Sequence, residues 1–130
     1  MPEREPAPNP TPAELEILRV LWKNPGSTVR ELHEKMTTGR NTGYTTVLKL
    51  LQIMTEKRLV TRDEVGRAHV YHPGVPEELV KSRMVDDLVE RAFGGAAQSL
   101  VMHALSTRKA SAQELAEIRR LLEQLEDEAR

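Results

Sequence analysis

The spacing of apolar residues changes once within the first 75 residues. Between residues 12 and 57, apolar side chains recur every three or four positions, as in helices that pack one face on a core. From residue 59 the pattern becomes two short segments, 59–64 and 68–72, with β-branched and aromatic residues. They flank a three-residue turn that contains Gly66. The chain therefore has to place a β-hairpin directly after a group of helices.

Capping signals set the ends of the first two helices. The capping box Thr11–Glu14 predicts a helix over 12–23, which stops at an Asn-Pro-Gly sequence. A second box, Thr28–Glu31, opens a shorter helix that we expect to end at Thr38 and Gly39. Three helices with short connections thus precede the hairpin.

The third helix, predicted over 44–57, has two distinct faces. Its apolar stripe has helical spacing and predicts packing on a core. The stripe consists of Val47, Leu50, Leu51 and Met54. The order helix, helix, helix, hairpin is typical of a winged helix-turn-helix, a mainly α fold with a small β-hairpin wing.

The residues after the hairpin are helical by pattern, with predicted helices at 76–93, 96–105 and from 111 to the end. The capping box Ser111–Glu114 opens the last of them. A bundle of this size buries little surface alone, so its apolar stripes need a partner. Packing on the first domain is one solution, and a second copy of the chain is the one we favour. The predicted dimerisation residues are Leu88, Phe93, Leu115, Ile118, Leu122 and Leu125. We divide the chain into a disordered tail (1–10), a winged-helix domain (11–75) and a helical dimerisation domain (76–130).

The second helix of a helix-turn-helix motif reads base edges in the major groove. In this chain that helix is 44–57, and its outward face is rich in side chains suited to bases and phosphates. The candidate DNA-binding residues on it are Tyr44, Thr45, Thr46, Leu48, Lys49 and Gln52. A solvated amphipathic face is the alternative reading, and two further features favour DNA.

The first feature is the hairpin, where Arg62, Arg67 and His69 surround a glycine-containing tip that can lie over phosphates. The second is the segregation of charge behind a formal net charge of -1. From Lys35 to His72 there are seven basic and three acidic residues, whereas residues 76–130 hold eight basic and eleven acidic ones. The basic excess lies where DNA would bind.

Other classes of protein find little support. The chain has no Cys, which excludes disulfides, thiolate metal sites and Cys nucleophiles. Its four His residues lack metal-ligand spacing, and neither a phosphate-binding Gly-rich loop nor a nucleophile elbow is present. We therefore expect no enzyme activity, no metal and no cofactor. The charged, proline-rich start and the lack of a long apolar run predict a cytoplasmic protein.

Several stretches together resemble the penicillinase-repressor family (BlaI/MecI type), whose relatives include the copper-responsive CopY repressors. The resemblance covers about residues 11–125. The matching stretches are Glu14–Trp22, Tyr44–Leu51, Lys57–Val60, Tyr71–Pro73, Phe93–Gly95 and Ser99–Val101.

This resemblance implies a homodimeric repressor that binds palindromic operators through a winged helix. It also implies a membrane-bound zinc-metalloprotease sensor that triggers cleavage of the repressor shortly after Ser-Leu-Val, here between His103 and Ala104. The best-known members have Asn-Phe at that bond and often a basic or polar residue at the position of Leu48, so the operator need not be theirs. The missing Cys pairs argue against copper sensing. A winged-helix protein-interaction module without specific DNA binding is the alternative function, and salt-dependent DNA binding would distinguish the two.

Overall fold

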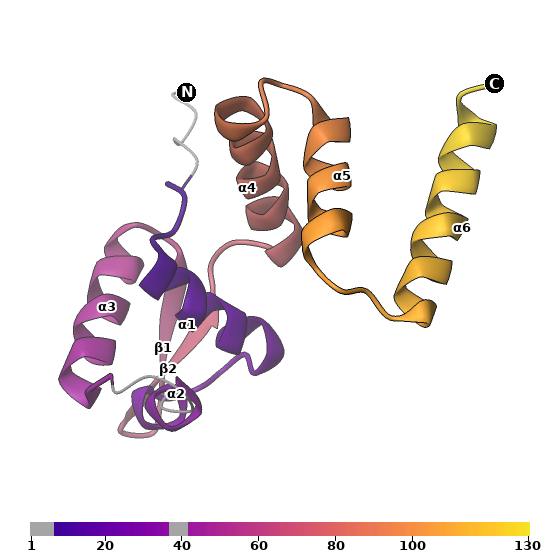
Figure 1. Ribbon diagram of the computed structural model, residues 1–130. Coiled ribbons are helices and arrows are strands. Elements are labelled where there is room, and N and C mark those ends of the chain that lie inside the picture. Colours follow the sequence, from indigo (N-terminus) through magenta and orange to yellow (C-terminus); the bar gives the residue numbers. More distant parts are fainter. Residues whose placement is uncertain (1–6, 37–41) are drawn as a thin grey trace. The chain divides into compact units, whose positions relative to one another are not determined.

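The computed structural model describes residues 7–36 and 42–130, and within them eight elements follow one another (Figure 1). They are α1 (Pro12–Lys23), α2 (Val29–Met36), α3 (Tyr44–Glu56), β1 (Val60–Val65), β2 (Ala68–Pro73), α4 (Glu77–Ala92), α5 (Ala97–Thr107) and α6 (Ala112–Glu128). The predicted mainly α fold with a β-hairpin wing is confirmed. The expected end of the second helix at Thr38 and Gly39 lies outside the described residues, as do residues 1–6 of the expected tail.

Helix α1 begins as its capping box predicts. The hydroxyl of Thr11 accepts a hydrogen bond from the Glu14 amide at 3.2 Å, and the Glu14 carboxylate accepts one from the Thr11 amide at 2.9 Å. Pro12 occupies the first helical position, where no amide hydrogen is needed. Ile17, Leu18 and Leu21 then bury their side chains completely.

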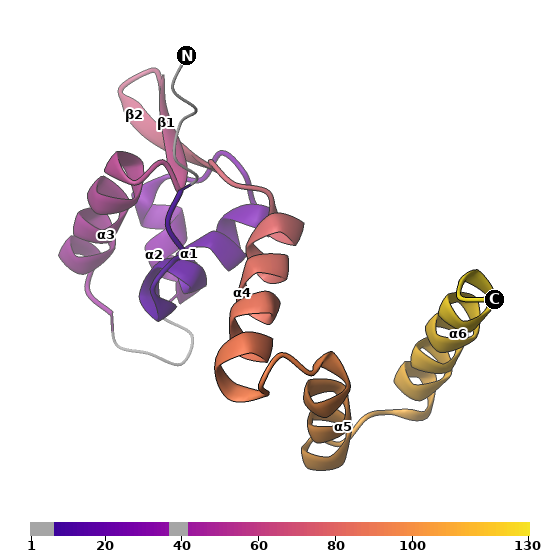
Figure 2. The same ribbon diagram turned by 90° about the horizontal axis from the view of Figure 1, so that it is seen from above.

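One apolar core unites the three N-terminal helices and the hairpin. Its buried members are Ile17, Leu18, Leu21, Val29, Leu32, Met36, Val47, Leu51, Met54, Leu59, Val60, Tyr71, Val75 and Val80. Three of the four apolar residues predicted to face inward from α3 are buried, while Leu50 is half-buried at the edge of this core. Figures 1 and 2 show α1, α2 and α3 gathered beside the hairpin.

The hairpin is an antiparallel pair in which Val60 lies opposite Pro73 and Val65 opposite Ala68. Because Val65 still pairs with Ala68, the turn contains two residues, one fewer than predicted. The tight turn requires a positive φ at Gly66, which has a φ of 64°. Tyr71 anchors the hairpin, because its side chain is buried and its backbone exchanges hydrogen bonds with Ser27 before α2. Tyr71 thus fixes the wing to the helices near its base, where Val60 of β1 is also buried in the core.

The chain divides into two compact units, residues 1–85 and 86–130, and the division falls within α4. The boundary expected after Val75 falls between β2 and α4 and stays a prediction. In the C-terminal unit, α5 and α6 bury no residue, and their leucine and valine side chains are largely exposed. The assignment of this unit to dimerisation stays a prediction.

Candidate nucleic-acid interface

The exposed face of α3 carries the side chains predicted to contact DNA. Thr45, Lys49 and Gln52 are spaced at i, i+4 and i+7, so they share one helix face, and all three are exposed. Tyr44 and Thr46 are exposed at the start of the same helix. In the part of the chain that the structure describes, no carboxylate pairs with Lys49. This face therefore offers a cation and an amide within the first three turns of α3.

Leu48 differs from the other predicted residues of α3. Its side chain is half-buried and packs against the core. It lies at the junction of the exposed face with the apolar one, so only part of its side chain can contact a partner.

Contacts from α2 hold the start of α3. The ring nitrogen Nε2 of His33 donates to the carbonyl oxygen of Thr42 at 2.9 Å. The His33 and Tyr44 rings meet edge to face, with centroids 5.9 Å apart and planes at 77°. Gly43 caps α3 without a side-chain hydrogen bond, so the first amides of the helix stay available to an anion.

An ion pair holds the other end of α3. Lys57, which follows the last helical residue, donates to both carboxylate oxygens of Glu14 in α1, at 3.1 and 2.9 Å. Burial raises the pKa of the Glu14 carboxyl, but hydrogen bonds from the Thr11 amide and from Lys57 outweigh it, so the pKa lies below its ordinary value. Both ends of α3 are therefore tied to neighbouring helices.

The wing carries two cations without acidic partners and two histidines, His69 and His72, that each lie beside a carboxylate. Among the described residues, no carboxylate forms an ion pair with Arg62 or Arg67, and both are exposed. His69 lies opposite Glu64 in the ladder, with Nε2 3.2 Å from the carboxylate. The arginines are thus the stronger candidates for phosphate contacts, since the imidazole of His69 already has a carboxylate partner in Glu64.

A shallow groove joins α2, α3 and the wing, and it shows residues that sequence reasoning missed. Its lining consists of Thr28, Val29, Arg30, Tyr44, Leu48, Arg67, Ala68, His69 and Tyr71. The groove brings together four of the predicted residues, Tyr44, Leu48, Arg67 and His69. It adds Thr28, just before α2, and Arg30 in the first turn of α2. The capping box at Thr28 marks this helix start in the sequence, but nothing local indicates that it faces the wing.

The residues predicted to dimerise lie on the C-terminal helices. Leu88, Leu115, Leu122 and Leu125 are each between 45% and 50% exposed. Ile118 and Phe93 are half-buried, and the Phe93 ring lies 5.9 Å from that of His103. His103 and Ala104, the predicted cleavage position, are exposed within α5.

No group of three or more His, Cys, Asp or Glu side chains in residues 7–36 and 42–130 is arranged to hold a metal ion. In the same ranges, no helix has the length and apolar character needed to cross a membrane.

The sequence pattern of the penicillinase repressor family matches residues 10–124. The chain belongs to this family. The resemblance inferred from the sequence is confirmed, and so is the expectation that the protein is a regulator rather than an enzyme. This member of the penicillinase repressor family is a transcriptional repressor with a winged-helix domain of the DNA-binding type.

Relatives of known name support this assignment. The transcriptional regulator BlaI of Mycobacterium tuberculosis is 35% identical over 112 residues, which cover 85% of this chain and 80% of that protein. The penicillinase repressor of Bacillus licheniformis is 27% identical over 121 residues, which cover 90% of this chain and 91% of that protein.

Solved structures place the N-terminal unit in the same fold. The solution structure of the DNA-binding domain of the repressor BlaI has a TM-score of 0.50 and 25% identity, and the match covers 56% of this chain and 89% of that one. The Bacillus licheniformis BlaI monomeric form, solved in complex with the blaP half-operator, gives the same values.

Proposed function

We propose that this repressor binds palindromic operator DNA as a homodimer, with α3 in the major groove of each half-site. The observation that carries the proposal is the exposed face of α3, where Lys49 and Gln52 lie beside Thr45 in a helix held at both ends. The complex of the relative BlaI with a half-operator supports it. Lysine and glutamine side chains on a helix that enters the major groove can hydrogen-bond to base edges.

The contacts divide into two kinds. Lys49 and Gln52 read base edges, and Thr45 with the exposed part of Leu48 meets thymine methyl groups. Tyr44 and Thr46 bind phosphates at the start of α3, where the uncapped amides also favour an anion. Phosphate contacts fix the register of the protein, and base contacts select the sequence.

The wing and α2 bind the flanking backbone. Arg67 and His69 from the wing and Arg30 from α2 line one groove, so a phosphate entering it meets cations from two elements. Arg62 lies directly opposite Tyr71 in the hairpin and extends the basic surface along the wing. Each phosphate neutralised in this way releases counterions and makes the affinity salt-dependent.

Dimerisation supplies the second half-site. The exposed leucines of α4 and α6, with Ile118, form apolar faces that a second copy can bury. Linking two winged helices makes the second binding event intramolecular, and this raises the overall affinity through effective concentration.

Loss of the dimer would then release DNA. In line with the family resemblance, we propose cleavage between His103 and Ala104 after activation of a membrane-bound metalloprotease sensor. Thr107 donates to the carbonyl oxygen of His103, so this bond lies in hydrogen-bonded helix. Cleavage therefore requires α5 to unfold locally around this bond before the protease can cut it.

Capture of genomic DNA fragments by the full chain tests the proposal. We expect a small set of fragments that share an inverted repeat, and we expect the variant with Lys49→Ala and Gln52→Ala to lose their enrichment. Recovery of random fragments by both proteins would instead favour a winged-helix module that acts through protein contacts.

A further inference from the structure

A second groove runs along α1 and the first half of α4, and its lining includes none of the residues proposed to bind DNA. We call it the α1–α4 groove. It has a volume of about 510 Å³ and is lined by Leu15, Arg19, Trp22, Lys23, Glu77, Lys81 and Met84. All of these residues belong to the N-terminal unit.

The walls of this groove are fixed by contacts on both helices. The indole Nε1 of Trp22 in α1 donates to the carbonyl oxygen of Val75, just before α4, at 3.0 Å. Val75 and Val80 join the buried core and hold the start of α4 in place. The α1–α4 groove is therefore preformed, and filling it costs little conformational entropy.

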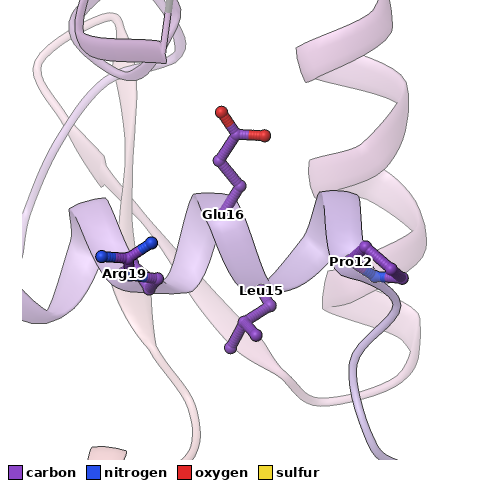
Figure 3. Close-up of a pocket in the computed structure, with 4 residues that line it drawn as sticks. All are labelled: Pro12, Leu15, Glu16 and Arg19. Carbon is purple, nitrogen blue, oxygen red and sulfur yellow. The ribbon is translucent and has the colours of Figure 1, made fainter. Parts of the chain in front are cut away.

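The α1–α4 groove has an apolar lining. Leu15 and Trp22 are half-buried, and Met84 is 39% exposed. Figure 3 draws a neighbouring pocket on α1 that shares Leu15 and Arg19 with this groove, and it shows the Leu15 side chain pointing away from that of Glu16. Together the three apolar side chains present a surface that a partner of the same character can cover.

The rim of the groove is basic. Arg19, Lys23 and Lys81 contribute three cations against one acid, Glu77. The Glu77 carboxylate, 2.8 Å from Lys81, accepts a hydrogen bond from the Lys81 ammonium and holds its pKa above the ordinary value. No carboxylate in the described ranges pairs with Arg19 or Lys23. An acidic, apolar partner would satisfy both features of the groove.

Helix α6 has this chemistry. It contains six acidic and two basic residues. Leu121, Leu122 and Leu125 are about half exposed in its C-terminal part. Glu126 follows Leu122 by four residues and Glu128 follows Leu125 by three, so acids adjoin the leucines on the helix surface.

We propose that the C-terminal half of α6 from a second copy of the chain docks in the α1–α4 groove. Its leucines would cover Leu15, Trp22 and Met84, and Glu126 and Glu128 would face Arg19 and Lys81. Each chain contributes one groove and one helix, as the twofold symmetry of a dimer requires. This inference rests on the proposed homodimer and assigns it a specific contact.

A charge exchange between two full-length variants tests the contact. The groove variant carries Arg19→Glu and Lys81→Glu, and the helix variant carries Glu126→Lys and Glu128→Lys. Each variant alone sets like charges against each other, and we expect its dimer dissociation constant to rise on the order of 100-fold. In an equimolar mixture both contacts are again of opposite charge, so the heterodimer should form with nearly wild-type affinity.

Sedimentation measures the dissociation constant of each variant's homodimer, and native mass spectrometry measures the share of heterodimer in the mixture. Circular dichroism checks that each variant is folded. The variant with Arg62→Glu and Arg67→Glu changes the charge equally on the wing and should dimerise as the wild type does. Variants that dimerise normally, or a mixture without preference for the heterodimer, would overturn the α6 contact and leave the homodimer standing. A monomeric wild type would overturn the homodimer itself.

Discussion

The Nζ atom of Lys57, just after α3, lies 3.1 and 2.9 Å from the two carboxylate oxygens of Glu14 in the first turn of α1. The Glu14 side chain is 2% exposed and that of Lys57 is 33% exposed, so the carboxylate is shielded from water while the ammonium still reaches it. The same carboxylate accepts a hydrogen bond from the Thr11 amide. One buried acid therefore caps the first helix and fixes the far end of the proposed recognition helix.

Glu14 should make the stability of the winged helix pH-dependent. Its pKa lies below the ordinary value of 4.5 in the folded state. The stabilisation is therefore present above that pH and is lost as the pH falls through the lower, folded pKa. We expect Glu14→Gln to lower the free energy of unfolding at pH 7 by about 1–3 kcal/mol, since it removes a charged partner from Lys57. Denaturant titrations at several pH values measure this effect.

The control for Glu14→Gln is Glu31→Gln. Glu31 forms the same kind of capping box with Thr28, but it is exposed. This variant should change stability at pH 7 less than Glu14→Gln does. Equal losses from the two variants would mean that the Lys57 ion pair adds nothing.

Base contacts from α3 should be sensitive to single substitutions. We expect Lys49→Ala to weaken binding to an operator duplex by about 1–3 kcal/mol, since this exposed cation lies in the face proposed to enter the groove. The variant with Arg62→Ala and Arg67→Ala should lose a similar binding free energy for each phosphate contact removed. Fluorescence anisotropy at moderate salt measures both, with the exposed Lys109→Ala as the control. Unchanged affinity in all these variants would show that this face of α3 and the wing do not bind the operator.

Arg30 should behave as a phosphate contact. It lies in the first turn of α2 and lines the groove with Arg67. Arg30→Ala should therefore weaken operator and unrelated duplexes about equally, and the slope of log affinity against log salt should fall by about 1. Salt titrations with the two duplexes test this. A loss confined to the operator would assign Arg30 to base reading instead.

The apolar stripe of α6 should be required for the dimer. Replacing Ile118 and Leu122 by lysine puts two charges into the proposed seam, and sedimentation should then show monomers. Gln113 and Gln124 lie on the opposite face of the helix, so their replacement by lysine is the matched control. A dimer that survives the first pair of changes would place the seam elsewhere.

The local elements could be predicted from the sequence because short-range chemistry determines them. The boxes Thr11–Glu14, Thr28–Glu31 and Ser111–Glu114 place three helix starts, and all three pairs form in the structure. The spacing of Val47, Leu51 and Met54 likewise indicates the buried face of α3.

Contacts between distant residues could not be predicted in this way. Nothing near Arg30 in the sequence indicates that Arg67 lies across a groove from it, and Glu14 and Lys57 are 43 residues apart. The half-burial of Leu48 and Leu50 also depends on how α3 meets its neighbours rather than on its own period. The site residues on the wing stay predictions until DNA binding is measured.

Sequence-specific operator binding is tested by the affinity of the full chain for an inverted repeat recovered from genomic capture. The comparison is with a duplex of equal length in which both half-sites are scrambled, at salt concentrations from about 50 to 200 mM. We predict that the chain binds the repeat at least about 1,000-fold more tightly than the scrambled duplex, with log affinity falling linearly with log salt. Equal affinity for the two duplexes would contradict sequence-specific binding by this repressor.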